Sequence, residues 1–342
     1  MDSSADKDPQ TARTPISVEA LAQGVLVGDR AALGRAITLV ESRRTDHRGL
    51  ADELLDRVHS KTGQSYRIGV TGMPGVGKST FIDQFGTNLT ATGHRVAVLA
   101  VDPTSNRTGG SILGDKTRMS RLAVDANAFI RPSPAGKTLG GVTRTTRETM
   151  LLCEAAGFDV VIVETVGVGQ SESAVAGMVD FFLVLLLPGA GDELQGLKRG
   201  LIELADMIAI NKADGELAGR ATATAAEYRA ALRTLSPREG DWQPEVVTVS
   251  SLENRGLGEL WSEIRQHRQL TTASGAFEAK RRDQAVAWMR DLIEDRLRNL
   301  LRGNPKIRAR MDALEAEVRA GAKLPALAAE ELLSLAGLDA GA

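Results

Sequence analysis

The sequence has few cysteines, histidines and aromatic residues, and each shortage excludes a class of protein. Among 342 residues there is one cysteine, Cys153, so no disulfide can form within the chain and a reducing compartment is expected. The four histidines lie far apart and form no metal-ligand spacing. Aromatic residues make up 4% of the chain, so the core must be built from Leu, Val, Ile and Ala.

Strong net charge and long apolar runs are also absent. The formal net charge is −2, so we expect no nucleic-acid partner and no attraction to an anionic membrane. The longest apolar run, residues 181–187, is too short to span a bilayer and predicts a buried strand. The polar N-terminus has the pattern of neither a secretory signal nor a transit peptide. We therefore expect a soluble, cytoplasmic protein.

The order of strand-like and helical segments predicts the fold class. From Tyr66 onward, short runs such as YRIGVTG, RVAVLAVD and DVVIVE alternate with helical stretches. Strands that are apolar along their whole length are typical of a sheet covered on both faces. We expect an α/β fold with a doubly wound, mostly parallel sheet, in which ligands bind at the carboxyl ends of the strands.

Changes in pattern along the chain predict four segments. These are a disordered tail at 1–15, an N-terminal helical region at 16–62, the α/β domain at 63–272 and a C-terminal helical arm at 273–342. In the last segment one apolar stripe has helical spacing, formed by Val286, Met289, Ile293, Leu297 and Leu300. Such helices either pack on their own domain or form a dimerisation arm, and a second, heptad-like stripe mildly favours the arm.

The stretch GMPGVGKST follows an expected strand and precedes an amphipathic helix. This is the P-loop pattern, with Lys78 and Ser79 after the second glycine. Its glycines let backbone N–H groups turn toward phosphates, and the start of the helix adds partial positive charge. Lys78 would reach the β- and γ-phosphates, and Ser79 would ligate Mg²⁺. The predicted phosphate-binding residues are Gly72, Pro74, Gly75, Val76, Gly77, Lys78, Ser79 and Thr80.

The stretch INKAD, which follows another apolar strand, predicts a guanine-reading motif. The Asp214 carboxylate can accept hydrogen bonds from guanine N1–H and the 2-amino group, whereas adenine would leave it unpaired. Lys212 would lay its alkyl stem along the base, and Asn211 would tie the base edge to the loop. Ser250, Ser251 and Leu252 resemble the last guanine-contact segment of GTPases. The sequence therefore predicts GTP as substrate and GDP as product.

Carboxylates for Mg²⁺ are expected at three strand ends or loops. Glu164 ends a strand and begins E-x-x-G with Gly167, where other GTPases have D-x-x-G. Gln170 could orient the attacking water. Asp102 ends the second strand and Asp115 lies in the glycine-rich loop beyond it. Each of these two either approaches Mg²⁺ or serves as a turn or helix-cap residue.

With these motifs the chain resembles the MeaB/ArgK/MMAA family of P-loop GTPases. The likeness runs from the N-terminal helices to the C-terminal arm, through GMPGVGKST, AVDPTS, VVIVETVGVGQSE, GAGDELQGLKRG, INKAD and VVTVSSLENRGLGELW. The resemblance implies a homodimeric GTPase whose C-terminal helices mediate dimerisation. It also implies a chaperone that protects methylmalonyl-CoA mutase, an adenosylcobalamin enzyme, and gates its cofactor loading.

Other functions compete with this interpretation. A kinase or ATPase linked to amino-acid transport is disfavoured by the N-K-x-D motif. A GTPase that inserts nickel would need a Cys/His cluster, and a purely structural module would not need Lys78 and Ser79 in an intact P-loop. Because no arginine is placed as an arginine finger, we expect slow intrinsic turnover.

Overall fold

The computed structural model describes residues 16–42, 44–101, 118–132, 139–165, 171–189, 199–235 and 242–338. The chain divides into two compact units, Met1–Glu278 and Ala279–Ala342. None of the helices in the described ranges combines the length and apolar character needed to cross a bilayer. The tail expected at residues 1–15 lies outside these ranges.

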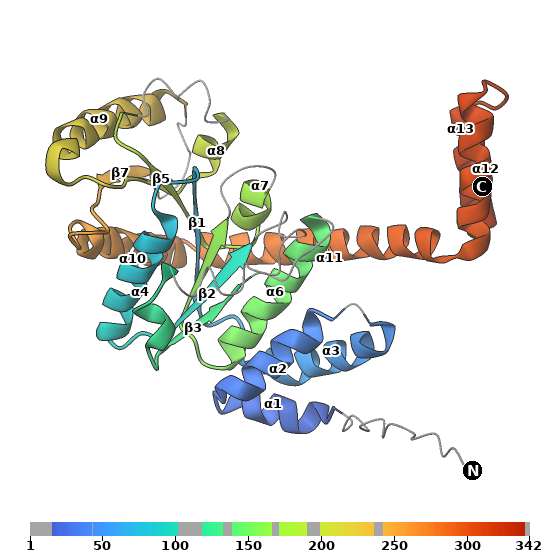
Figure 1. Ribbon diagram of the computed structural model, residues 1–342, viewed down its shortest axis with the longest axis horizontal. Coiled ribbons are helices and arrows are strands. Elements are labelled where there is room, and N and C mark those ends of the chain that lie inside the picture. The colour runs from blue at the N-terminus through green and yellow to red at the C-terminus, as the bar shows by residue number, and fades with distance from the viewer. Residues whose placement is uncertain are drawn as a thin grey trace, which may run out of the picture. The chain divides into compact units, whose positions relative to one another are not determined.

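A seven-stranded sheet forms the centre of the first unit (Figure 1). Its strands are β1 (Tyr66–Gly72), β2 (Val96–Val101), β3 (Ala128–Arg131), β4 (Val160–Thr165), β5 (Phe181–Leu186), β6 (Met207–Ile210) and β7 (Glu245–Thr248). They lie in the order β3-β2-β4-β1-β5-β6-β7, and every neighbouring pair is parallel. The doubly wound parallel sheet expected from the sequence is confirmed.

The apolar character of the strands follows from their burial on both faces. In β2, Ala97 and Leu99 face one core cluster, while Val96 and Val98 face the other. All six residues of β4 and of β5 are buried. Because β1 lies between β4 and β5, its carboxyl end opens at the point where the strand order reverses, which is the usual ligand position in such folds.

Helices cover both faces of the sheet (Figure 1). One face packs against α4 (Lys78–Ala91), η3 (Leu122–Val124) and α10 (Leu257–Ala273). The other packs against α6 (Leu139–Ala155), α7 (Ser171–Ala176), α8 (Arg199–Leu204) and α9 (Ala218–Leu235). The short turn η5 (Gly215–Leu217) precedes α9.

The N-terminal helices belong to the same core as α6. They are α1 (Val18–Leu26), α2 (Arg30–Val40) and α3 (Thr45–Val58), followed by the turn η1 (His59–Lys61). Side chains cap the first two, since Ser17 accepts from Ala20 N and Asp29 accepts from Ala31 N and Ala32 N. Apolar residues of α2 and α3, including Ile37 and Leu54, are fully buried and extend the core beneath the sheet.

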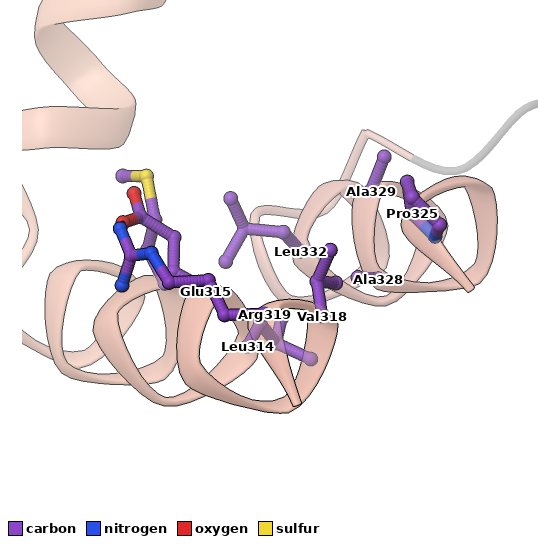
Figure 2. A pocket seen from close by; sticks show the side chains of 9 residues that line it. Leu314, Glu315, Val318, Arg319, Pro325, Ala328, Ala329 and Leu332 are labelled. Carbon is purple, nitrogen blue, oxygen red and sulfur yellow. The ribbon is translucent and has the colours of Figure 1, made fainter. Parts of the chain in front are cut away.

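Three helices carry the C-terminal segment: α11 (Ala276–Gly303), α12 (Pro305–Arg319) and α13 (Pro325–Leu335). Pro305 and Pro325 each occupy the first turn of their helix, where the missing N–H costs nothing. Arg310 on α12 pairs with Glu331 on α13 at 2.5 Å and with Glu317 at 2.8 Å. Between α12 and α13 lies an apolar groove lined by residues such as Leu314, Val318 and Leu332 (Figure 2).

A buried carboxylate joins α6 to the start of β1. Glu154 accepts hydrogen bonds from Ser65 Oγ at 2.6 Å, Gly63 N at 2.7 Å and Arg67 Nε at 2.8 Å. Burial alone would raise the pKa of this carboxyl, but the bonds and charge of Arg67, with those of Ser65 and Gly63, hold it below its usual range. The stabilisation is therefore present above the ordinary glutamate pKa and is lost as the pH falls.

We expect Glu154→Ala to destabilise the first unit strongly, because it leaves the largely buried guanidinium of Arg67 without its charge partner. The loss in the free energy of unfolding should be about 3 kcal/mol, measured by urea unfolding. Glu53→Ala on α3 is the matched control, since it removes an exposed ion pair with Arg57 and should cost less than about 1 kcal/mol. Equal losses in the two variants would contradict this assignment.

Candidate functional site

The loop between β1 and α4 depends on glycine at particular positions. Gly72, Gly75 and Gly77 have φ angles of 152°, 82° and 93°, which other residues rarely adopt. A Cβ at Gly72 would lie 2.5 Å from the Leu185 carbonyl oxygen, and one at Gly77 would lie 3.0 Å from Asn211 Nδ2. The glycines therefore allow the loop to curl close to β5 and to the N-K-x-D segment.

Lys78 is held inside this loop. Its side chain is mostly buried, and Nζ donates hydrogen bonds to the carbonyl oxygens of Gly72 at 2.7 Å and Met73 at 3.3 Å. Burial lowers the pKa of Lys78, while the negative charge of Glu164 opposes this shift. The ammonium group is thus partly removed from water at the place where phosphate oxygens would enter the loop, as expected for a P-loop lysine.

Ser79 and Glu164 meet beside the loop. Ser79 Oγ lies 3.4 Å from Glu164 Oε1, and Glu164 is aligned with Val70 of β1 and with Ala100 of β2. A hydroxyl and a carboxylate are the oxygen ligands that Mg²⁺ prefers. No group of three or more His, Cys, Asp or Glu residues suited to a metal occurs in the described ranges. In P-loop proteins Mg²⁺ usually has few protein ligands, and phosphate oxygens and water fill its other coordination positions. Ser79 and Glu164 fit this pattern.

Asn211 joins the P-loop to the segment after β7. Its Nδ2 donates to the Val76 carbonyl oxygen at 2.9 Å, and its Oδ1 accepts from Ser251 Oγ at 2.8 Å and Ser251 N at 3.3 Å. The side chain is almost fully buried, so both ends of the amide must be paired. One side chain therefore fixes two loops that are far apart in the sequence.

The other residues of the motif lie next to this bridge. Lys212 has a left-handed backbone with φ 58°, and its Nζ donates to the Gly75 carbonyl oxygen at 2.8 Å. Asp214 Oδ2 accepts from the buried Ser250 Oγ at 2.5 Å, while the Asp214 side chain stays partly exposed. The side chain of Leu252 is exposed, so a contact with the base would have to come from its backbone.

Several predicted residues are thus brought together, and others cannot be placed. The structure gathers the P-loop, Glu164, the N-K-x-D segment and Ser250–Ser251 at one edge of the sheet. Gly167, Gln170, Asp102 and Asp115 lie outside the described residues, so their roles stay predictions. Pro74 and Thr80 are exposed at the loop and at the start of α4.

Sequence reasoning missed a buried hydroxyl pair next to Glu164. Thr165 Oγ1 donates to Thr71 Oγ1 at 2.7 Å, and both threonines are fully buried. This bond joins the carboxyl ends of β4 and β1. Glu164 precedes Thr165 in β4, and the P-loop follows β1. The sequence did offer a signal for this pair. Each of the two apolar runs, YRIGVTG and VVIVET, has a threonine near its end.

Comparisons with known proteins match most of the chain to GTPases. The family described as "Methylmalonyl Co-A mutase-associated GTPase MeaB" matches residues 33–306. A "Putative GTPase" of Caulobacter vibrioides is 58% identical over 94% of this chain and 99% of its own length. GTPase ArgK of Escherichia coli is 52% identical over 81% of this chain and 84% of its own.

More distant relatives cover nearly the same region. The mouse "Methylmalonic aciduria type A homolog, mitochondrial" is 48% identical over 92% of this chain and 79% of its own length. The solved structure of a "LAO/AO transport system kinase" is 39% identical, with a TM-score of 0.75 over 94% of this chain and 99% of that one. The chain therefore belongs to the MeaB family of P-loop GTPases and is itself a GTPase.

Proposed function

We propose that the chain binds GTP with Mg²⁺ and uses slow hydrolysis as a timing signal for a client enzyme. The client is an adenosylcobalamin-dependent methylmalonyl-CoA mutase, which the chain protects and whose cofactor loading it gates. The bridge from Val76 through Asn211 to Ser251 supports this most directly, because it joins a phosphate loop and a base-reading loop in one site. The printed name of the matching family supports the choice of client.

The P-loop would bind the nucleotide phosphates. Backbone N–H groups from Gly75 to Thr80 and the start of α4 supply fixed positive potential for the phosphate oxygens. Lys78 exchanges its bonds to the two loop carbonyls for bonds to the β- and γ-phosphates. As water attacks the γ-phosphate in line, the ammonium stabilises the charge that spreads over the phosphate oxygens.

Mg²⁺ would be held by Ser79 and Glu164, and Asp102 and Asp115 are further candidate ligands. When bound, the ion would neutralise negative charge on the β- and γ-phosphates. In the described structure the Ser79 hydroxyl already points to the Glu164 carboxylate. Gly167 would sense the γ-phosphate and Gln170 would orient the attacking water, as proposed from the sequence.

Guanine would be selected by Asp214. Ser250 Oγ donates a hydrogen bond to one oxygen of this carboxylate, and the carboxylate would accept hydrogen bonds from guanine N1–H and the 2-amino group. The stem of Lys212 would cover the base plane, and the backbone of Ser251 and Leu252 would meet the guanine O6 atom. Adenine offers no matching donors, so it would leave a partly desolvated carboxylate without partners.

We expect Lys78→Ala to reduce the rate of GTP hydrolysis by a factor on the order of 10² or more. The variant lacks the ammonium group that would stabilise negative charge on the phosphate oxygens in the transition state. Phosphate release at saturating GTP measures the effect. Lys61→Ala is the matched control, since Lys61 is an exposed lysine on η1. Wild-type turnover in Lys78→Ala would contradict the phosphate assignment.

The client is tested by measuring GTP hydrolysis with and without purified methylmalonyl-CoA mutase. We expect faster hydrolysis with the mutase, because the sequence does not predict an arginine finger and a partner can complete or order the site. A nucleotide-dependent complex should appear in gel filtration. An unchanged rate together with the absence of a complex would leave a GTPase with another client.

A homodimer formed through the C-terminal helices is the second part of the proposal. On α11 the apolar residues Val286, Met289 and Ile293 are exposed, as are Leu297 and Leu300. The groove between α12 and α13 is also lined mainly by apolar side chains (Figure 2). Apolar surface of this kind is typical of protein interfaces, and the family resemblance supports a second copy of the chain as the partner.

Charged residues on the α11 stripe should break this dimer. We expect the full chain with Met289→Glu and Ile293→Glu to be monomeric, because burying two unpaired carboxylates is costly. Light scattering after gel filtration measures the mass. Leu204→Glu, at an exposed leucine of α8, is the control and should leave the dimer intact. A dimer that persists in the double variant, and after deletion of residues 279–342, would exclude the arm as the interface.

A further inference from the structure

Polar side chains form a continuous row along one side of the P-loop helix α4. Arg121 donates from Nη1 to Gln84 Oε1 at 2.7 Å, and Gln84 Nε2 donates to Asn88 Oδ1 at 2.9 Å. Asn88 Nδ2 in turn donates to Asn254 Oδ1 at 2.7 Å. We call Gln84, Asn88 and Asn254 the amide relay. Each amide in the middle of the row donates in one direction and accepts from the other, so the three bonds run head to tail.

The relay begins at a firmly held segment. Arg121 Nε donates to Asp83 Oδ2 at 3.0 Å, and Asp83 Oδ1 accepts from Leu122 N at 2.9 Å. The side chain of Leu122 packs so closely on α4 that a Cβ at Gly86 would lie 2.7 Å from its Cδ2 atom. Asp83 and Gln84 are themselves buried. The hydrogen bond from Arg121 therefore orients the Gln84 amide so that its nitrogen points to Asn88.

The relay ends in the loop that follows β7. Ser250 and Arg255 close this loop with two backbone hydrogen bonds of 3.0 Å. On one side the loop is held by Asn211 and Asp214 through Ser251 and Ser250. On the other side Asn254, which has a left-handed backbone with φ 52°, is held by Asn88 of α4.

We propose that Gln84 and Asn88 are positioning residues for guanine nucleotide binding. Their relay ties the loop 250–255 to the helix whose first turn forms the phosphate site, so that base contacts and phosphate contacts keep their spacing. The proposal rests on the proposed function, in which residues 250–252 lie against guanine. Since neither side chain is part of the P-loop or touches Glu164, the relay acts on retention of the nucleotide and leaves the hydrolytic step unchanged.

The experiment measures dissociation of a fluorescent GDP analogue from the full chain. We expect Asn88→Ala and Asn254→Gly each to release it roughly three- to tenfold faster, as the loss of one net hydrogen bond gives about fivefold. Turnover at saturating GTP should stay within about twofold of wild type. Alanine suits the helix at position 88, and glycine accepts the left-handed backbone at 254, so both variants should fold.

The double variant decides whether the two asparagines act through one bond. Asn88→Ala combined with Asn254→Gly should release the analogue no faster than the faster single variant. Asn127→Ala is the control, because Asn127 is an exposed asparagine before β3, and it should release at the wild-type rate. Wild-type release in both single variants, multiplied effects in the double variant, or a parallel fall in saturated turnover would each overturn the relay.

A separate variant distinguishes failure of the relay from failure of the base assignment. Asp214→Asn should shift preference from GDP toward xanthosine diphosphate, because an amide can donate to the 2-oxo group. If that shift occurs while Asn88→Ala releases GDP normally, the relay alone is wrong. If Asp214→Asn keeps its preference for GDP, the base assignment is wrong. The proposed role of the relay, which depends on that assignment, is then wrong as well.

Discussion

The buried amide of Asn211 is the contact on which the site depends. It pairs with the Val76 carbonyl oxygen through its nitrogen and with Ser251 through its oxygen. The parallel sheet brings the ends of β1 and β6 to one edge, with β5 between them, so that a single side chain can span the gap. An apolar residue here would leave buried polar groups in both loops without partners. The P-loop and the segment after β7 are therefore held together by one side chain, and the proposed function assigns phosphate binding to the first and base reading to the second.

Charge placement around this arrangement explains the chemistry. Burial of Lys78 in the P-loop lowers its pKa, and the nearby Glu164 carboxylate counteracts that effect. The two charges would be separated by nucleotide phosphates and by Mg²⁺, which need a cation on one side and oxygen ligands on the other. The Thr71–Thr165 bond joins β1, which leads into the P-loop, to β4, which carries Glu164. Fixed charges and dipoles of this kind are what stabilise the charge that develops during phosphoryl transfer.

The sequence alone predicted the features that depend on residues close together in the chain. Strand periodicity gave the parallel sheet, and the spacing of Gly72 to Ser79 and of Asn211 to Asp214 identified both loops. Contacts between distant segments could not be predicted, because the bonds of Gln84 and Asn88 to Arg121 and Asn254 depend on how α4 packs. Asn211 was predicted to contact the base edge, which stays a prediction, whereas the structure shows its amide joining two protein loops.

Guanine selectivity is the central claim, and comparing dissociation constants for GDP and ADP on the unmodified full chain tests it most directly. If Asp214 reads the base as proposed, GDP should bind tighter than ADP by a factor on the order of 10² or more. Comparable affinities for the two nucleotides would contradict the account.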